Sequence, residues 1–190
     1  MIYKNVKRLL DVIFSIILFV LFIPLWIVIP ILIKADSAGR VVFTQKRVGS
    51  GSNYFKIYKF RTMKEGTPDI PTDKVKNQKD LNTKLGTTLR RLSIDEIPQL
   101  YNILKGEMSF VGPRPALYNQ ARLISLRKER SVDRIRPGVT GLAQVSGRDS
   151  LTIPEKVRYD SRYVDEMSLW LDAKIVFVTV RAVLNGKGGN

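Results

Sequence analysis

The chain has no cysteine and no histidine among its 190 residues. The missing cysteine excludes disulfide bonds and thiolate metal sites. The missing histidine excludes a histidine general base, a histidine metal site and a Ser-His-Asp triad. Acid–base and nucleophilic chemistry must therefore be carried out by Asp, Glu, Lys, Tyr, Ser or Thr side chains.

Acidic residues are also scarce, because 17 Asp and Glu stand against 32 Lys and Arg and give a formal net charge of +15. This charge favours anionic partners, such as a phospholipid surface, a nucleotide, a nucleic acid or a phosphorylated lipid. The basic residues are spread out and accompany no nucleic-acid-binding motif, so we expect no nucleic-acid partner. The alternative to an enzyme is a membrane-anchored basic module that binds anionic lipid or nucleic acid without catalysis.

An uncharged apolar run extends from Val12 to Ile33. As a straight helix it would be about 33 Å long, enough to cross the hydrocarbon core of a bilayer as a single transmembrane helix. However, Pro24 near its middle predicts a kink, and basic residues flank both ends, which favours both flanks on the cytoplasmic face. A re-entrant hairpin fits both observations. Asp11, at the rim beside Arg8, is either solvated at the interface or paired with a basic side chain.

The rest of the chain predicts an α+β fold that is mostly helical, with a small β-hairpin from 41–45 and 54–60. Helices are expected over 85–92, 97–104, 116–130, 153–167 and 169–184. The third is basic and amphipathic, and the last is expected to lie in the membrane interface or to pack on the domain rather than to span. Loops are expected over 64–84 and 136–148. We expect a membrane anchor over 1–36, a catalytic domain over 37–184 and a disordered tail over 185–190.

Two adjacent carboxylates, Asp95 and Glu96, follow Arg90 and Arg91 and precede a Gly-Pro-Arg-Pro turn at 112–115. Pro98 predicts that a helix begins close to the acid pair, because proline is tolerated in the first turn. A helix N-terminus favours carboxylates and attracts phosphate. The simpler alternative is that Ser93, Asp95 and Glu96 form an ordinary capping arrangement.

Basic residues surround the acid pair in the sequence, and arginine is suited to bidentate phosphate binding. Arg114 lies in the stiff turn, which can aim its guanidinium. An acid that binds Mg²⁺ next to an acid that attacks phosphorus is a coherent arrangement for phosphoryl chemistry.

Ordered motifs along nearly the whole chain resemble the bacterial sugar transferases, the monotopic polyprenyl-phosphate phosphoglycosyl transferases that begin capsule, O-antigen and glycoprotein glycan assembly. The matching segments are KRLLD (7–11), the apolar segment with Pro24, VVFTQKRVG (41–49), FKIYKFRTM (55–63), LRRLSIDEIPQLYNILKGEMSFVGPRP (89–115), IRPGVTGLAQVSGR (135–148) and the region of Tyr159 and Asp160. The chain looks closest to capsule-type members that use a deoxy-amino sugar.

This resemblance implies a two-step reaction at the cytoplasmic face of the bacterial inner membrane. Asp95 would attack the β-phosphate of a UDP-sugar and expel UMP, and undecaprenyl phosphate would then take the phosphosugar. Glu96 would hold Mg²⁺. Downstream membrane glycosyltransferases are expected partners.

Further site residues follow from the same motif matching. The expected substrate contacts are Lys59, Arg61, Arg114, Arg148 and Asp160. The expected contacts with lipid headgroups are Lys7, Arg8 and Arg90. One position departs from the family pattern, since Ile23 precedes Pro24 where the family usually has serine, and isoleucine has no hydroxyl to satisfy a carbonyl freed by the kink.

Overall fold

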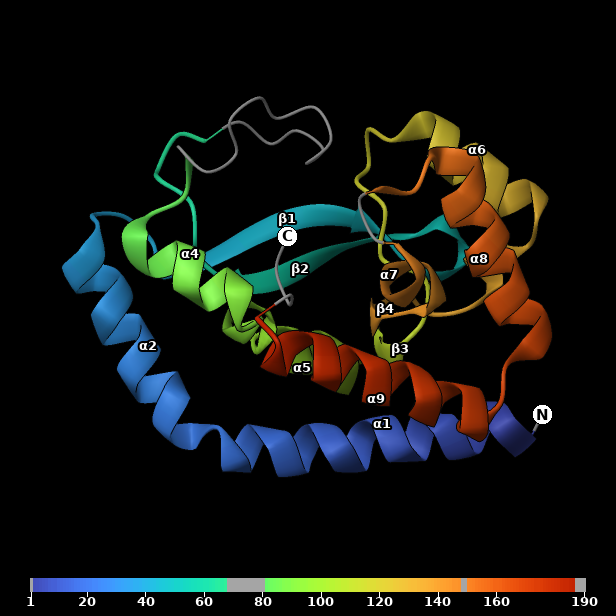
Figure 1. Cartoon of the computed structure of the whole chain (residues 1–190), viewed down its shortest axis with the longest axis horizontal. Helices are drawn as coiled ribbons and strands as arrows, with labels where there is room; N and C mark the ends of the chain where they lie inside the picture. The colour runs from blue at the N-terminus through green and yellow to red at the C-terminus, as the bar shows by residue number, and fades with distance from the viewer. Residues whose placement is uncertain (1, 68–80, 148–149, 187–190) are drawn as a thin grey trace.

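The computed structural model describes residues 2–67, 81–147 and 150–186, and Figure 1 shows the arrangement of their helices and strands. The elements in chain order are α1 (Ile2–Leu21), α2 (Ile23–Asp36), β1 (Val42–Val48), η1 (Ser50–Ser52), β2 (Tyr54–Phe60), α4 (Lys84–Arg91), η3 (Ile94–Glu96), α5 (Gln99–Lys105), β3 (Ser109–Val111), α6 (Ala121–Glu129), η4 (Val132–Arg134), β4 (Gly138–Thr140), α7 (Leu142–Ser146), α8 (Ile153–Glu166) and α9 (Leu169–Leu184). The predicted α+β class, mostly helical with one antiparallel hairpin, is confirmed.

The N-terminal helices form a bent pair, with α1 along one side of the molecule and α2 turning away from its end (Figure 1). The two axes differ by 61° at a break around Phe22, and Pro24 occupies the first turn of α2. The predicted kink is therefore confirmed. Over the described ranges, no single helix is long and apolar enough to cross a membrane. The bent pair taken together has the length and the apolar composition to do so.

The charged end of α1 is bound to the rest of the chain rather than free. Arg8 donates to the carbonyl oxygens of Ile103 and Leu104, at 2.6 and 2.9 Å, and so caps the C-terminus of α5. Cations are favoured at that end of a helix because its last carbonyls carry partial negative charge. Asp11 is buried and accepts hydrogen bonds from Ser109 Oγ and the Phe110 amide, both at 3.1 Å. Neither of the two environments predicted for Asp11 is correct.

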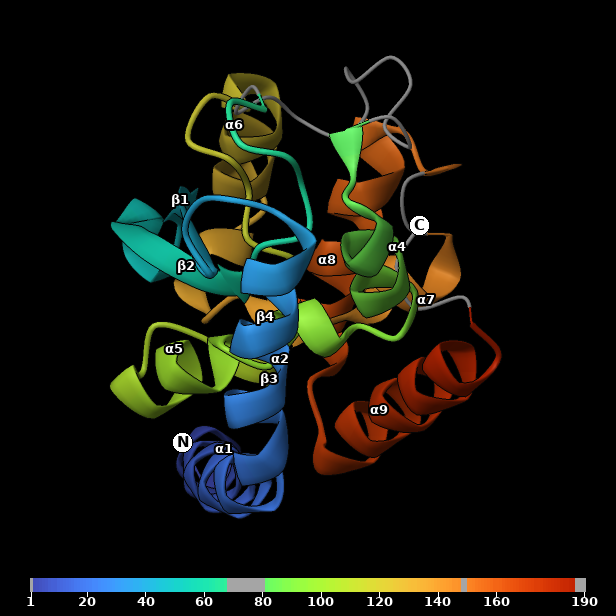
Figure 2. The same ribbon diagram turned by 90° about the vertical axis from the view of Figure 1, so that its left-hand side faces the viewer.

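A buried polar cluster joins the start of α1 to α8 and α9. Lys7 Nζ lies 2.7 Å from Asp172 Oδ2, and the hydroxyls of Tyr3 and Tyr163 donate to the same carboxylate at 2.9 and 2.6 Å. Figure 2, turned by 90°, shows α1 nearly end-on below α2, with α9 on the other side of the molecule's lower edge. These contacts fix the direction in which α1 leaves the domain.

The hairpin β1–β2 supplies one wall of the core. Its antiparallel register pairs Phe43 with Lys59 and Lys46 with Lys56. Ile57 and Phe60 are buried, and the ring of Phe60 meets that of Trp26 on α2 at 5.6 Å. The alternation along β2 therefore sends Lys59 to the side of the strand opposite Lys56, which is exposed.

A second pair of strands is parallel, and one of its strands, β4, lies where the sequence predicts a loop. β3 pairs with β4, with Ser109 opposite Gly138 and Val111 opposite Thr140. A Cβ on Gly138 would lie 2.1 Å from the Gly112 amide nitrogen, so glycine is required where the two backbones meet. The predicted loop over 136–148 is therefore wrong in part, because it contains β4 and α7.

The other predicted helices are confirmed with adjusted ends. α4, α5, α8 and α9 match their expected ranges, and Gly106 ends α5 with a left-handed φ of 81°. The helix expected from 116 begins only at Ala121. Most of the loop expected over 64–84, and residues 187–190 of the expected tail, lie outside the described residues.

Candidate functional site

The acid pair lies on a separate 3-10 turn, η3, between α4 and α5. Ser93 begins this turn with a left-handed φ of 55°, and its side chain makes no capping hydrogen bond. The ordinary capping arrangement is therefore wrong. The helix predicted to begin close to the acid pair, α5, begins at Gln99 with Pro98 as its N-cap, so the two acids precede it on their own turn. The left-handed backbone of Ser93 is strained for a residue other than glycine, and strained residues of this kind cluster at functional sites.

One ammonium group contacts both acids. Lys59 Nζ, from β2, lies 2.6 Å from Glu96 Oε1 and 3.8 Å from Asp95 Oδ2. Arg114 approaches the same Glu96 oxygen, with Nη1 and Nη2 each at 3.5 Å. The Arg114 side chain is half exposed, whereas those of Lys59 and the two acids are largely covered. The structure thus brings together four predicted site residues from β2, η3 and the 112–115 turn.

The pKa values of the two carboxyl groups are shifted in opposite directions. Burial raises the pKa of Asp95, while Lys59 acts against that rise and Glu96 adds to it. Burial also opposes ionisation of Glu96, but the charges of Lys59 and Arg114 and their hydrogen bonds lower the pKa of Glu96 to about 2. A pair of acids with pKa values displaced in opposite directions is typical of a division of catalytic roles.

The donor set is compatible with one magnesium ion held mainly by a substrate. Glu96 is ionised and offers hard carboxylate oxygen, the ligand type that Mg²⁺ prefers, next to a second carboxylate. No group of three or more acidic side chains that could hold a metal occurs among the described residues. Because Mg²⁺ commonly uses one or two carboxylates together with substrate phosphates, Glu96 fits the role of the protein ligand in such a site.

Asp160, another predicted substrate contact, is buried and bound by Arg127, and its substrate role stays a prediction. Arg127 Nε and Nη2 donate to Asp160 Oδ2 at 2.9 and 2.6 Å, and Asp160 is 1% exposed. Burial raises the pKa of Asp160, and Arg127 acts in the opposite direction. Arg127 was missed from the sequence, where nothing marks it among the basic residues of its helix.

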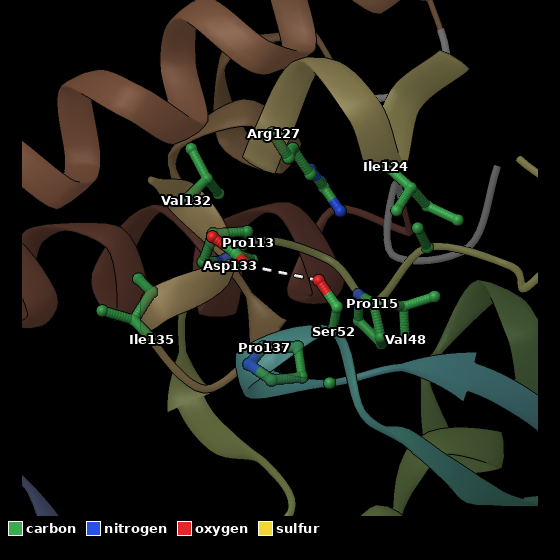
Figure 3. A pocket seen from close by; sticks show the side chains of 12 residues that line it. Val48, Ser52, Pro113, Pro115, Ile124, Arg127, Val132, Asp133, Ile135 and Pro137 are labelled. Carbon is green, nitrogen blue, oxygen red and sulfur yellow. Dashed lines mark hydrogen bonds between the residues drawn. The ribbon is translucent and has the colours of Figure 1, made fainter. Parts of the chain in front are cut away.

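A small cavity lies behind the 112–115 turn, beside Arg127 (Figure 3). Its volume is about 30 Å³, enough for water molecules but well below the size of a ligand pocket. Pro113, Pro115 and Pro137 line it, and Ser52 donates a hydrogen bond of 3.2 Å to Asp133 at its edge. The cavity is therefore a packing space that backs the turn, and the acid pair lies elsewhere.

The other predicted residues have protein partners of their own. Arg61 donates to the carbonyl oxygens of Ser37 and Ala38 and so holds the connection after α2. Arg90 donates to Asn82, and its charge lowers the pKa of Asp95. Lys7 and Arg8 have the contacts described above. The lipid and substrate roles of these residues stay predictions, and Arg148 lies outside the described residues.

A family model described as bacterial sugar transferase matches residues 2–186 of this chain. The chain is 39% identical over 194 residues to UDP-N-acetylgalactosamine-undecaprenyl-phosphate N-acetylgalactosaminephosphotransferase from Aeromonas hydrophila, which covers 98% of this chain and 45% of that protein. It is 38% identical over 204 residues to exopolysaccharide production protein ExoY from Rhizobium meliloti (strain 1021), which covers 96% of this chain and 87% of that protein.

A third relative is galactosyl transferase CpsE from Streptococcus agalactiae serotype III (strain NEM316). It is 38% identical over 162 residues, which are 79% of this chain and 36% of that protein. The chain therefore spans less than half the length of the Aeromonas and Streptococcus proteins and most of the Rhizobium protein.

Proposed function

The chain belongs to the bacterial sugar transferase family, and we propose that it transfers a sugar phosphate from a UDP-sugar to undecaprenyl phosphate and releases UMP. The observation that carries this proposal is the acid pair with oppositely displaced pKa values, in contact with Lys59 and Arg114. Both substrates are phosphate anions, so a carboxylate can approach them only where cations offset the repulsion.

In the first step, a carboxylate oxygen of Asp95 attacks the phosphorus that carries the sugar. The bond from this phosphorus to the bridging oxygen breaks, and the bridging oxygen leaves with UMP. The sugar phosphate remains on Asp95 as an acyl phosphate. The burial of Asp95 supports this role, because a poorly hydrated carboxylate with a raised pKa is a stronger nucleophile.

In the second step, a phosphate oxygen of undecaprenyl phosphate attacks the same phosphorus. The bond between phosphorus and Asp95 breaks, the carboxylate is restored, and the product is a polyprenyl diphosphate sugar. Such a relay allows a water-soluble donor and a lipid acceptor to use one site in turn.

The remaining groups at the site supply positive charge. Glu96 would hold Mg²⁺, which when bound neutralises the diphosphate of the donor and its leaving group. Lys59 keeps Glu96 ionised, and the guanidinium of Arg114 extends from the turn towards the same oxygen of Glu96. We expect Arg114 to bind a phosphate group of the donor through its two outer nitrogens.

We also propose that α1 and α2 enter the cytoplasmic leaflet of the bacterial inner membrane as a re-entrant hairpin. Apolar side chains along both helices are exposed, among them Phe14, Ile17, Val20, Ile27 and Ile31. Such an exposed surface is typical of contact with lipid rather than water.

Helix α9 offers a second exposed apolar surface, with Trp170, Phe177 and Leu184 exposed to 79%, 68% and 80%. We propose that it lies in the interface, with tryptophan at headgroup level. The product would pass to downstream membrane glycosyltransferases that assemble a capsule, an exopolysaccharide or a glycoprotein glycan.

The test is a UMP-release assay in lipid nanodiscs with added Mg²⁺. The donors are UDP-glucose, UDP-galactose, UDP-N-acetylgalactosamine and a UDP-N-acetylated deoxy-amino sugar, the last being the expected substrate. Without undecaprenyl phosphate, we expect release of about one UMP per enzyme, and turnover once the lipid is added. Asp95→Asn should abolish both phases, whereas Asp165→Asn, an exposed acid on α8, should retain them. Full activity of Asp95→Asn would refute the covalent mechanism.

A further inference from the structure

The turn that carries Arg114 is held at every carbonyl from Pro113 to Ala116. The Gly138 amide donates to Pro113, and the Val48 amide donates to Ala116, both at 3.0 Å. Between them, Arg127 Nη1 donates to the carbonyl of Arg114 at 2.8 Å and Arg47 Nη1 to that of Pro115 at 3.0 Å. Four successive carbonyls are thus bonded to donors from three segments, β1, α6 and β4, which fixes the backbone of the turn.

The Arg114 side chain extends from this fixed backbone. It is half exposed, and its contacts with Glu96 are long, at 3.5 Å. The position of its Cα, between two prolines that restrict the backbone, limits where the guanidinium can reach.

Arg127 is the donor placed at the carbonyl of Arg114 itself, and it is in turn fixed. Two of its nitrogens bind Asp160 Oδ2, while the third binds the turn. The Arg127 side chain is 11% exposed, and that of Asp160 is 1% exposed. A planar guanidinium can serve both acceptors at once in fixed directions, which a lysine ammonium cannot do in the same geometry.

We propose that Arg127 is a positioning residue: oriented by Asp160, it holds the backbone at Arg114 and so aims the Arg114 guanidinium at the acid pair. The effect on catalysis rests on the proposed phosphosugar transfer, in which Arg114 meets a substrate phosphate. Asp160 then acts on the substrate indirectly, through Arg127 and Arg114, rather than through the direct contact expected from the sequence.

The first part of the test needs no substrate. Hydrogen exchange of the segment 111–117 is measured by mass spectrometry on the full chain in nanodiscs. Arg127→Met should speed exchange in this segment, while Arg162→Met, which removes the arginine of an exposed pair on α8, should leave it unchanged. Unchanged exchange in Arg127→Met would overturn the proposal that Arg127 holds the turn.

The second part tests whether the effect of Arg127 on catalysis depends on the Arg114 side chain. We expect Arg127→Met to lower kcat for UMP release about 10- to 100-fold, because a displacement of about 1 Å in a catalytic group has effects of this size. In the Arg114→Met background, Arg127→Met should lower kcat by less than about threefold, because the two residues act as one unit. Independent effects that multiply in the double variant would refute the positioning role.

Two further variants cover the case in which Arg127→Met fails to fold in a thermal melt. Arg127→Lys and Asp160→Asn keep the size and much of the polarity of the two side chains, and both should show the same fall in kcat and the same dependence on Arg114. Wild-type protein that releases no UMP from any donor would refute the proposed function instead. In that case the exchange experiment still decides whether Arg127 holds the turn.

Discussion

Lys59 Nζ contacts both members of the acid pair, at 2.6 Å from Glu96 Oε1 and 3.8 Å from Asp95 Oδ2. Since Lys59 comes from β2 and the acids from η3, the hairpin and the turn must pack correctly for the site to exist. The unequal distances explain why the lysine lowers the pKa of Glu96 decisively and only moderates the effect of burial on Asp95.

Removal of this ammonium should impair catalysis without unfolding the protein. We expect Lys59→Met to lower kcat/KM about 100-fold, the scale of losing one electrostatic contact in an active site. Lys59→Arg should retain more activity because it keeps the charge. The control is Lys56→Met, which changes an exposed lysine on the other face of β2. UMP release measures all three, and equal activity of Lys59→Met and Lys56→Met would contradict the prediction.

The pH dependence of activity should report Asp95. Its carboxylate is the reactive form, so activity should fall as the pH falls through a pKa that burial has raised above the ordinary 3.8. Glu96 has a pKa of about 2 and stays ionised over this range. We expect an acid limb of kcat/KM above pH 3.8, measured where circular dichroism shows folded protein.

The sign of the shift can be tested with Lys59→Met. Lys59 lowers the pKa of Asp95 through its charge, so loss of the lysine should raise that pKa further and move the acid limb to higher pH. An acid limb that stays in place or moves to lower pH would show that another group controls it.

Much of the fold could be predicted because the signals are local. Segments rich in β-branched and aromatic residues marked the hairpin, and Pro24 marked the bend. By contrast, β3 and β4 have three residues each, too few to show a period, and their pairing joins segments far apart in the chain. No local pattern predicts such a pair.

Four residues predicted for the site lie together in the structure, but the contacts of the other predicted residues could not be read from the sequence. Lys59, Asp95, Glu96 and Arg114 meet as their motifs suggested, because each lies in a distinctive segment. The partner of Asp160 could not be predicted, since Arg127 lies 33 residues away on a helix with several basic residues. The sequence likewise could not show that Arg8 binds backbone carbonyls, which carry no signal in the identity of a residue.

The contacts of Arg8 predict a role in stability. Arg8→Met leaves two carbonyls at the end of α5 without a charged donor, and we expect the free energy of unfolding to fall by about 1 to 3 kcal/mol. Chemical denaturation in detergent measures this against Lys4→Met, an exposed lysine on the same helix. Unchanged stability combined with weaker binding to anionic vesicles would instead support the headgroup role expected from the sequence.

The same contacts predict the topology of α1. Lys7, Arg8 and Asp11 all bind residues of the folded domain, so the start of α1 should lie on the same side of the membrane as that domain. Because the chain has no native cysteine, a single introduced cysteine can be labelled without background labelling of other positions. In sealed vesicles, an impermeant maleimide should label Lys4→Cys and Asp165→Cys from the same face, and Val20→Cys, in the apolar part of α1, should be protected.

Substitution of the proline separates the effect of the bend from that of the contacts. Pro24→Ala restores a backbone donor and permits a straighter helix, whereas Pro30→Ala changes a proline inside α2, away from the break, and is the control. A single span would have to break the contacts of Lys7, Arg8 and Asp11, so we expect the label at position 4 to stay on the domain side in Pro24→Ala. Labelling at positions 4 and 165 from opposite faces in the chain with native Pro24 would refute the re-entrant arrangement. A change of face only in Pro24→Ala would show that the bend, rather than the contacts of α1, sets the topology.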